Sequence, residues 1–223
     1  MNTPTQRRLA AIVSADVVGY SRLMGVDEIG TLAALRAHRA ELIDAKIADH
    51  GGRIVKTMGD GLLLEFPSVV DATTCGIEMQ DGMAARNEVI AGDNRIVFRI
   101  GINLGDIIIE GEDILGDGVN IAARIEALAE PGGIAISARV HDDVRDRLEA
   151  QFVDGGEQNL KNISRPVRVW HWAPRTISVP NIKGALALPD VPSIAVLPFE
   201  NMSSDSEQEY FSDGISEDII TEI

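Results

Sequence analysis

The sequence has a single cysteine and no long apolar run, and each scarcity excludes a class of protein. Cys75 stands alone among 223 residues, so an intramolecular disulfide cannot form and an oxidising compartment is not implied. No stretch reaches the roughly 18 apolar residues of a membrane span, and no apolar signal segment follows Arg7 and Arg8. We therefore expect a cytoplasmic chain with no membrane segment, and a buried helical Cys75.

Positive charge is also scarce. The chain has 20 Lys and Arg residues against 35 Asp and Glu, a formal net charge of -15. Such a charge repels polyanions and anionic lipid surfaces, so nucleic acid is not an expected partner. A small phosphorylated substrate could still bind, provided that divalent metal ions and a few locally placed cations offset the acidic surroundings.

Several common sites are missing. The four histidines have no metal-ligand spacing, which argues against zinc. The sequence contains no G-x-x-x-x-G-K-[ST] motif of the usual phosphate-binding loop. Residues 113–124 do not fit a calcium-binding EF-hand, because position twelve is Arg124 and not glutamate.

The pattern along the chain alternates between strand-like and helix-like segments. We expect strands at 9–18, 53–57, 62–66, 96–105, 106–111, 133–137 and 166–172. We expect helices at 27–50, 69–91, within 116–133 and at 138–149. Asp-Gly at 60–61 and Gly-Asp at 105–106 predict turns. In the first helix, Ile29, Leu32, Leu35 and Leu42 recur at helical spacing, and Asp27 is its expected N-cap.

The character of the chain changes after Trp172. Residues 173–192 include four prolines and predict a linker. The final segment, 193–223, starts as a strand-like run and stops inside a helix-like one. We therefore predict one domain over 8–172, a linker, and the truncated start of a second domain in a fragment of a longer protein.

Asp16 and Asp60 are the strongest candidates for chemistry. Asp16 interrupts an apolar strand, where an uncompensated carboxylate costs free energy, and Asp60 occupies a Gly-Asp-Gly turn. Two such carboxylates suit Mg²⁺, which keeps its other positions for water and phosphate oxygens. The simpler interpretation is that both are turn residues, because aspartate favours turns for local reasons.

Three segments in order, SADVVGYS (14–21), KTMGDGLLLEF (56–66) and GEDILGDGVNIAARIEALAEPGG (111–133), resemble class III adenylyl and guanylyl cyclases. The resemblance covers about residues 8–172. It implies an α+β fold with a ferredoxin-like βαββαβ palm core and extra C-terminal α/β elements, paired as a head-to-tail homodimer with active sites at the interface. The segment after 193 resembles the start of a TolB-like module, although its acidic composition is also typical of an interaction peptide.

The resemblance implies an adenylate cyclase that converts ATP to cyclic AMP and pyrophosphate. Two Mg²⁺ or Mn²⁺ ions would lie at Asp16, Val17 and Asp60. Lys56 and Asp113 would recognise adenine, since a lysine donates to N1 and an aspartate accepts from the 6-amino group; guanylyl cyclases tend to have Glu and Cys there. The alternatives are a related palm-type cyclase, a guanylyl cyclase, and a catalytically silent cyclase-like domain that only binds nucleotide or a partner.

The remaining implied residues contact ribose and phosphates. Asn120 and Arg124 lie four apart on one helix face and would stabilise the transition state. Lys161 would bind the triphosphate, as would the backbone of Val18, Gly19, Tyr20 and Ser21. Because Lys56 and Asp60 share one hairpin yet serve opposite ends of the nucleotide, we expect each site to combine Asp16 and Asp60 of one chain with the other residues of the partner.

Overall fold

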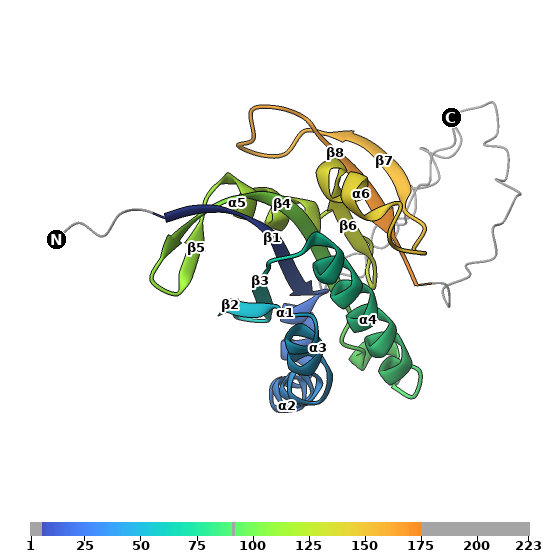
Figure 1. The fold of residues 1–223 in the computed structure, drawn as a ribbon. Helices are drawn as coiled ribbons and strands as arrows, with labels where there is room; N and C mark the ends of the chain where they lie inside the picture. The colour runs from blue at the N-terminus through green and yellow to red at the C-terminus, as the bar shows by residue number, and fades with distance from the viewer. Residues whose placement is uncertain (1–5, 91, 175–223) are drawn as a thin grey trace, which may run out of the picture. The chain divides into compact units, whose positions relative to one another are not determined.

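The computed structural model describes residues 6–90 and 92–174 (Figure 1). The predicted linker from residue 175 onward and the predicted second domain lie outside the described residues.

The strands form one mixed eight-stranded sheet, in the order β2-β3-β1-β4-β6-β8-β7, with β5 paired to β4. Their bounds are β1 (Gln6–Val17), β2 (Arg53–Met58), β3 (Gly61–Phe66), β4 (Phe98–Glu110), β5 (Asp113–Leu115), β6 (Ile134–Ser137), β7 (Val153–Gln158) and β8 (Val167–Trp172). Among the described strands, β4–β6 is the only parallel pair. The elements up to β4 follow the predicted β-α-β-β-α-β order, and the expected α+β class is confirmed.

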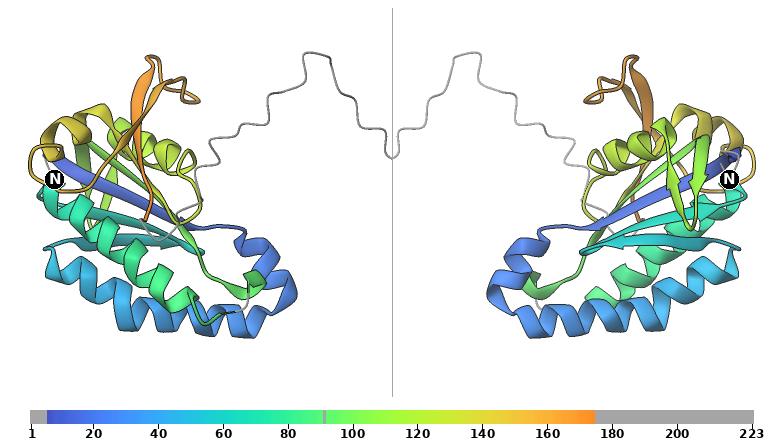
Figure 2. Two further views of the ribbon diagram at one scale, coloured as in Figure 1. Left: turned by 90° about the vertical axis from the view of Figure 1, so that its right-hand side faces the viewer. Right: turned by 90° about the vertical axis from the view of Figure 1, so that its left-hand side faces the viewer.

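Helical segments cover both faces of the sheet. Figure 2 shows α2, α3 and α4 on one side of the strands and α5 on the other. The segments are α1 (Tyr20–Val26), α2 (Glu28–His38), the π-helix η1 (Arg39–Ile43), α3 (Asp44–Asp49), α4 (Val69–Asn87), the short 3-10 helix η2 (Gly92–Asn94), α5 (Asp117–Glu126) and α6 (Ala138–Val144). Strand alternation along β1 explains the two layers, because Ala11 and Val13 pack in the core with α4, whereas Ala10 and Ile12 pack in the core with α5.

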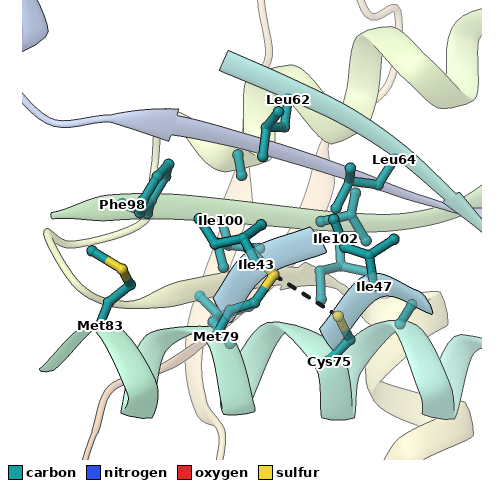
Figure 3. Close-up of a cluster of buried hydrophobic side chains, with 14 of the residues drawn as sticks. Ile43, Ile47, Leu62, Leu64, Cys75, Met79, Met83, Phe98, Ile100 and Ile102 are labelled. Carbon is teal, nitrogen blue, oxygen red and sulfur yellow. Dashed lines mark hydrogen bonds between the residues drawn. The ribbon is translucent and has the colours of Figure 1, made fainter. Parts of the chain in front are cut away.

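The main core lies between the sheet and helices α3 and α4 (Figure 3). Phe66, Phe98 and Ile100 are all at most 1% exposed, and burying each large side chain stabilises the fold by about 1.5–3 kcal/mol. Cys75 is buried on α4 as predicted, with its Sγ 3.8 Å from Met79 Sδ. Burial raises the pKa of the Cys75 thiol to about 12, so the thiol stays protonated.

The turn predicted at Gly105-Asp106 is wrong, because β4 runs unbroken through it. The whole strand pairs with β1, from Phe98 opposite Val17 to Ile109 opposite Gln6. The glycine has a packing role instead, since a Cβ at Gly105 would lie 2.9 Å from the Gly118 Cα of α5. The turn comes six residues later, at Gly111, whose φ is +61°.

Other boundaries also differ. The single helix predicted over 27–50 is divided by η1, although Asp27 caps α2 as predicted by accepting from the Gly30 N–H at 2.9 Å. Ile29 is 82% exposed and does not contribute to the core. The helices predicted at 69–91 and 138–149 are shorter, and strands β5 and β7 were not predicted. Both missed strands are short or glycine-containing, so they carry little alternating pattern.

Candidate active site

The structure brings Asp16 and Asp60 together. Asp16 is the penultimate residue of β1, and Asp60 lies in the turn between β2 and β3. Because β3 runs antiparallel beside β1, with Ala15 opposite Leu62, this turn reaches the end of β1. The Val17 N–H donates to Asp60 Oδ2 at 3.3 Å. Gly61 permits the approach, because a Cβ there would be 3.2 Å from Asp16 Oδ1.

The position of Asp16 disfavours its ionised form. Burial raises the pKa of Asp16, and the neighbouring Asp60 carboxylate adds to the increase. A divalent cation between them would remove this repulsion, and two carboxylates suit a hard ion that keeps positions for water and phosphate. In residues 6–90 and 92–174, no group of three or more His, Cys, Asp or Glu residues is arranged to hold a metal ion.

Two charged residues beside this pair were not singled out from the sequence. Arg99 lies opposite Asp16 in the β1–β4 ladder, and its Nε is buried without a hydrogen-bond partner in the described part of the chain. Glu126 ends α5, and burial together with Asp16 and Asp60 raises the pKa of its carboxyl to about 7. An arginine inside the apolar run FRIGIN was a usable signal, of the same kind that identified Asp16.

The predicted base-recognition residues form an ion pair. Lys56 Nζ on β2 lies 2.7 Å from Asp113 Oδ2 on β5. The lysine lowers the pKa of Asp113, and the Ile114 N–H adds to the effect. Arg53 helps to join these elements, because it pairs with the buried Glu65 of β3 and donates to the Glu112 carbonyl at 2.9 Å. The pair therefore presents one donor and one acceptor from neighbouring strands.

The other predicted residues are spread over three surface elements. Asn120 and Arg124 are both exposed on α5. Gly19, with φ +66°, precedes α1, which begins at Tyr20. Lys161 is exposed in the turn between β7 and β8. Each of these side chains or backbone groups faces solvent at least in part, so a ligand can reach it.

The structure does not join the two predicted groups within one chain. Among the residues described, no hydrogen bond or ion pair connects Asp16 or Asp60 with Lys56, Asp113, Asn120 or Arg124. Lys56 and Asp60 are close in sequence, yet one pairs with β5 and the other with the end of β1. The division of each site between two chains stays a prediction.

Comparisons with known proteins identify relatives of the whole described region. Residues 4–172 match the family model of the adenylate and guanylate cyclase catalytic domain. The chain is 53% identical over 222 residues to "Putative adenylate cyclase 3" of Rhizobium meliloti. That match covers 98% of the chain but 38% of the relative, so the chain spans about two fifths of the relative's length.

Solved structures of cyclases are also similar to this chain in fold and sequence. An adenylate/guanylate cyclase/hydrolase from Silicibacter pomeroyi is 50% identical, with a TM-score of 0.73, over 76% of this chain and 99% of that one. The adenylyl cyclase CyaB from P. aeruginosa is 26% identical, with a TM-score of 0.67, over 77% of this chain and 97% of that one. The guanylyl cyclase Cya2 is also 26% identical, with a TM-score of 0.67, over 79% of this chain and 98% of that one. In the part of the chain that is described, no helix has the length and apolarity to cross a membrane. The chain belongs to the adenylate and guanylate cyclase catalytic domain family.

Proposed function

We propose that this domain is an adenylate cyclase that converts ATP to 3′,5′-cyclic AMP and pyrophosphate. The observation that favours adenine over guanine is the ion pair of Lys56 and Asp113, whose Nζ and Oδ2 atoms lie 2.7 Å apart. A lysine donor suits adenine N1 and a carboxylate acceptor suits the 6-amino group, whereas guanine presents the opposite pattern on that edge. The similarity to "Putative adenylate cyclase 3" supports the same choice.

Asp16 and Asp60, with the Val17 backbone, are proposed to hold two Mg²⁺ or Mn²⁺ ions. Bound ions supply charge neutralisation and a lowered pKa of the ribose 3′-hydroxyl. The hydrogen bond from the Val17 N–H to Asp60 Oδ2 keeps the Asp60 turn at the end of β1, beside Asp16. The 3′-hydroxyl would release its proton to solvent, and its oxygen would form a bond to the α-phosphorus as the bond to the bridging oxygen of pyrophosphate breaks in line.

Asn120 and Arg124 are the proposed transition-state residues. Asn120 orients the ribose, and the planar guanidinium of Arg124 offers several donors to the charge that develops on the α-phosphate. Lys161 and the backbone of Val18, Gly19, Tyr20 and Ser21 are proposed to contact the triphosphate. The Arg22 and Leu23 N–H groups donate to the Gly19 carbonyl, so the N–H groups of Tyr20 and Ser21 are the ones proposed to meet an anion.

Head-to-tail homodimerisation completes the proposal. One chain contributes Asp16 and Asp60, and its partner contributes Lys56, Asp113, Asn120 and Arg124. The support is that Lys56 pairs with Asp113 of β5 whereas Asp60 contacts the end of β1, although Lys56 and Asp60 belong to one hairpin. Two equivalent sites per dimer follow from the two-fold symmetry.

The direct experiment compares ATP and GTP as substrates of the purified chain, with Mg²⁺ and with Mn²⁺, at high protein concentration. We expect cyclic AMP to form and cyclic GMP to form far more slowly. The absence of product with either metal would leave a nucleotide-binding domain without activity. Faster turnover of GTP would instead make the chain a guanylyl cyclase.

A further inference from the structure

One edge of β4 has a gap in its strand pairing. On this edge, β6 pairs with Ile100–Ile102 and β5 pairs with Ile108–Glu110. The five β4 residues between them, 103–107, have no strand partner there in the described part of the chain. The start of α5 lies beside the gap, since Asn103 Nδ2 donates to the Gly118 carbonyl at 3.0 Å.

A cavity of about 680 Å³ occupies this region. Its walls come from the C-terminal half of β4, the first turn of α5, the start of α6 and the start of β8. Four arginines line it: Arg7, Arg139, Arg165 and Arg168. Two carboxylates, Asp106 and Asp117, also line it. The excess of cations contrasts with the net charge of -15 for the chain.

Three of the four arginines have no ion-pair partner among the described residues. Arg168 is paired with Asp154, which lowers the pKa of that carboxyl to about 2, and its guanidinium lies 5.8 Å from the Trp170 ring centre. Arg7, Arg139 and Arg165 are exposed and make no ion pair or side-chain hydrogen bond within the described residues. Uncommitted guanidinium groups around one cavity are suited to bidentate binding of phosphate oxygens.

The first turn of α5 adds to the positive potential of the cavity. Gly116, Asp117 and Gly118 all line it, and the N-cap Gly116 supplies no side chain to accept from the first N–H groups of the helix. These groups and the helix dipole favour a nearby anion. The Asp117 carboxylate in the same turn opposes part of this effect, so the unpaired arginines provide the main selection for an anion.

We propose that this cavity binds a multiply charged phosphate anion and that it receives pyrophosphate released by the cyclase reaction. The second part rests on the proposed function. Arg165 lies in the same turn between β7 and β8 as Lys161, the proposed triphosphate contact. Ile121, which lines the cavity, directly follows the proposed catalytic Asn120 on α5. The cavity thus shares the β7–β8 turn with the proposed triphosphate contact, and neither Lys161, Asn120 nor Arg124 lines it.

The test is calorimetric titration of the full chain with inorganic pyrophosphate in the presence of a chelator, so that no metal at Asp16 and Asp60 can recruit the anion. We expect one binding site per chain. The double variant Arg139→Ala/Arg165→Ala should weaken binding by at least about tenfold, because two charge-assisted contacts are lost. The matched control Arg36→Ala/Arg147→Ala removes the same charge from exposed positions outside the cavity and should leave binding unchanged.

No binding by the parent chain, or an equal loss in the control variant, would overturn the cavity as a site. Loss only in Lys161→Ala would assign the anion to the substrate site instead. None of these results depends on turnover, so a failure of the cyclase assay leaves them interpretable. In active protein, product inhibition by pyrophosphate should weaken by about tenfold in Arg139→Ala/Arg165→Ala with KM for ATP within about twofold; unchanged inhibition would overturn the pyrophosphate role.

Discussion

The two ends of the proposed nucleotide site balance their charges differently. At the base end, Lys56 and Asp113 neutralise each other across 2.7 Å. At the metal end, Asp16 and Asp60 lie together, and burial and mutual repulsion raise the pKa of Asp16. Arg99 offsets only part of this charge, and Glu126 adds to it. The charges at the base end are therefore balanced without a ligand. At the metal end, the bound cation supplies the charge that balances the carboxylates.

This difference gives the two ends different tasks. The Lys56–Asp113 pair can exchange its internal hydrogen bond for two hydrogen bonds to a base. Because one bond is lost when two are gained, the pair contributes more to discrimination between bases than to binding affinity. A carboxylate pair with unbalanced charge attracts metal strongly, so its contribution is to rate. Substitutions at the two ends should consequently affect different measured quantities.

The largest effect is expected at the metal end. Asp60→Asn should lower kcat by about 10³-fold, because the amide keeps the shape of the side chain but loses the charge that holds the ion. Cyclase assays with ATP and Mn²⁺ measure this, and Asp143→Asn, an exposed change on α6, is the control. Activity within about threefold of the parent would remove Asp60 from the metal site.

Mixing two inactive chains tests whether the two ends belong to different protomers. Asp16→Ala and Lys56→Ala chains should each be inactive, and their mixture should regain about one quarter of parent activity. Half of randomly formed dimers are mixed, and one of their two sites is intact. No recovery in mixtures whose heterodimers are demonstrated by mass spectrometry would argue for sites within one chain.

A specificity change tests the base end. Lys56→Glu/Asp113→Cys should lower the ratio of kcat/KM for ATP over GTP by about 30- to 1000-fold, since each of the two reversed hydrogen bonds contributes about 1–2 kcal/mol to discrimination. Metal dependence should not change, because Asp16 and Asp60 are untouched. If the ATP and GTP activities both fall while the ratio of their kcat/KM values stays constant, Lys56 and Asp113 form a structural ion pair and do not recognise the base.

The smallest effect concerns pH and stability. The pKa of Glu126 is raised to about 7 in the folded chain from an ordinary 4.5, chiefly by burial and then by Asp16 and Asp60, with Arg99 opposing. The folded state therefore holds a proton that the unfolded state has released between these values, so the contribution of Glu126 to stability falls as pH rises from about 4.5 to 7.

After allowance for partial solvent exposure, this loss is about 1 kcal/mol. Glu126→Gln should be more stable than the parent at pH 8 and nearly equal at pH 4.5, measured by urea unfolding in chelator. A difference that does not vary with pH would show that Glu126 is not titrating in this range.

Much of the fold could be predicted locally. The 53–57 and 62–66 hairpin, the Asp27 cap and the buried Cys75 depend on short-range patterns, and all three are present. The false turn at Gly105-Asp106 had the same local pattern as the real hairpin. It was overridden by twelve residue pairs with β1 and by the need for a glycine beneath α5. Strands β5 and β7 were missed because neighbours, not their own residues, define them.

The sequence by itself determined which residue types are available for chemistry and in what order, because an aspartate in an apolar strand and an Asp-Gly turn are local features. Only the tertiary structure decided which of them meet. It brought Asp60 to the Val17 N–H, Lys56 to Asp113, and Arg99 and Glu126 to the carboxylate pair. The reason is physical: strand register and helix packing join residues far apart in the chain, and no local pattern encodes that register.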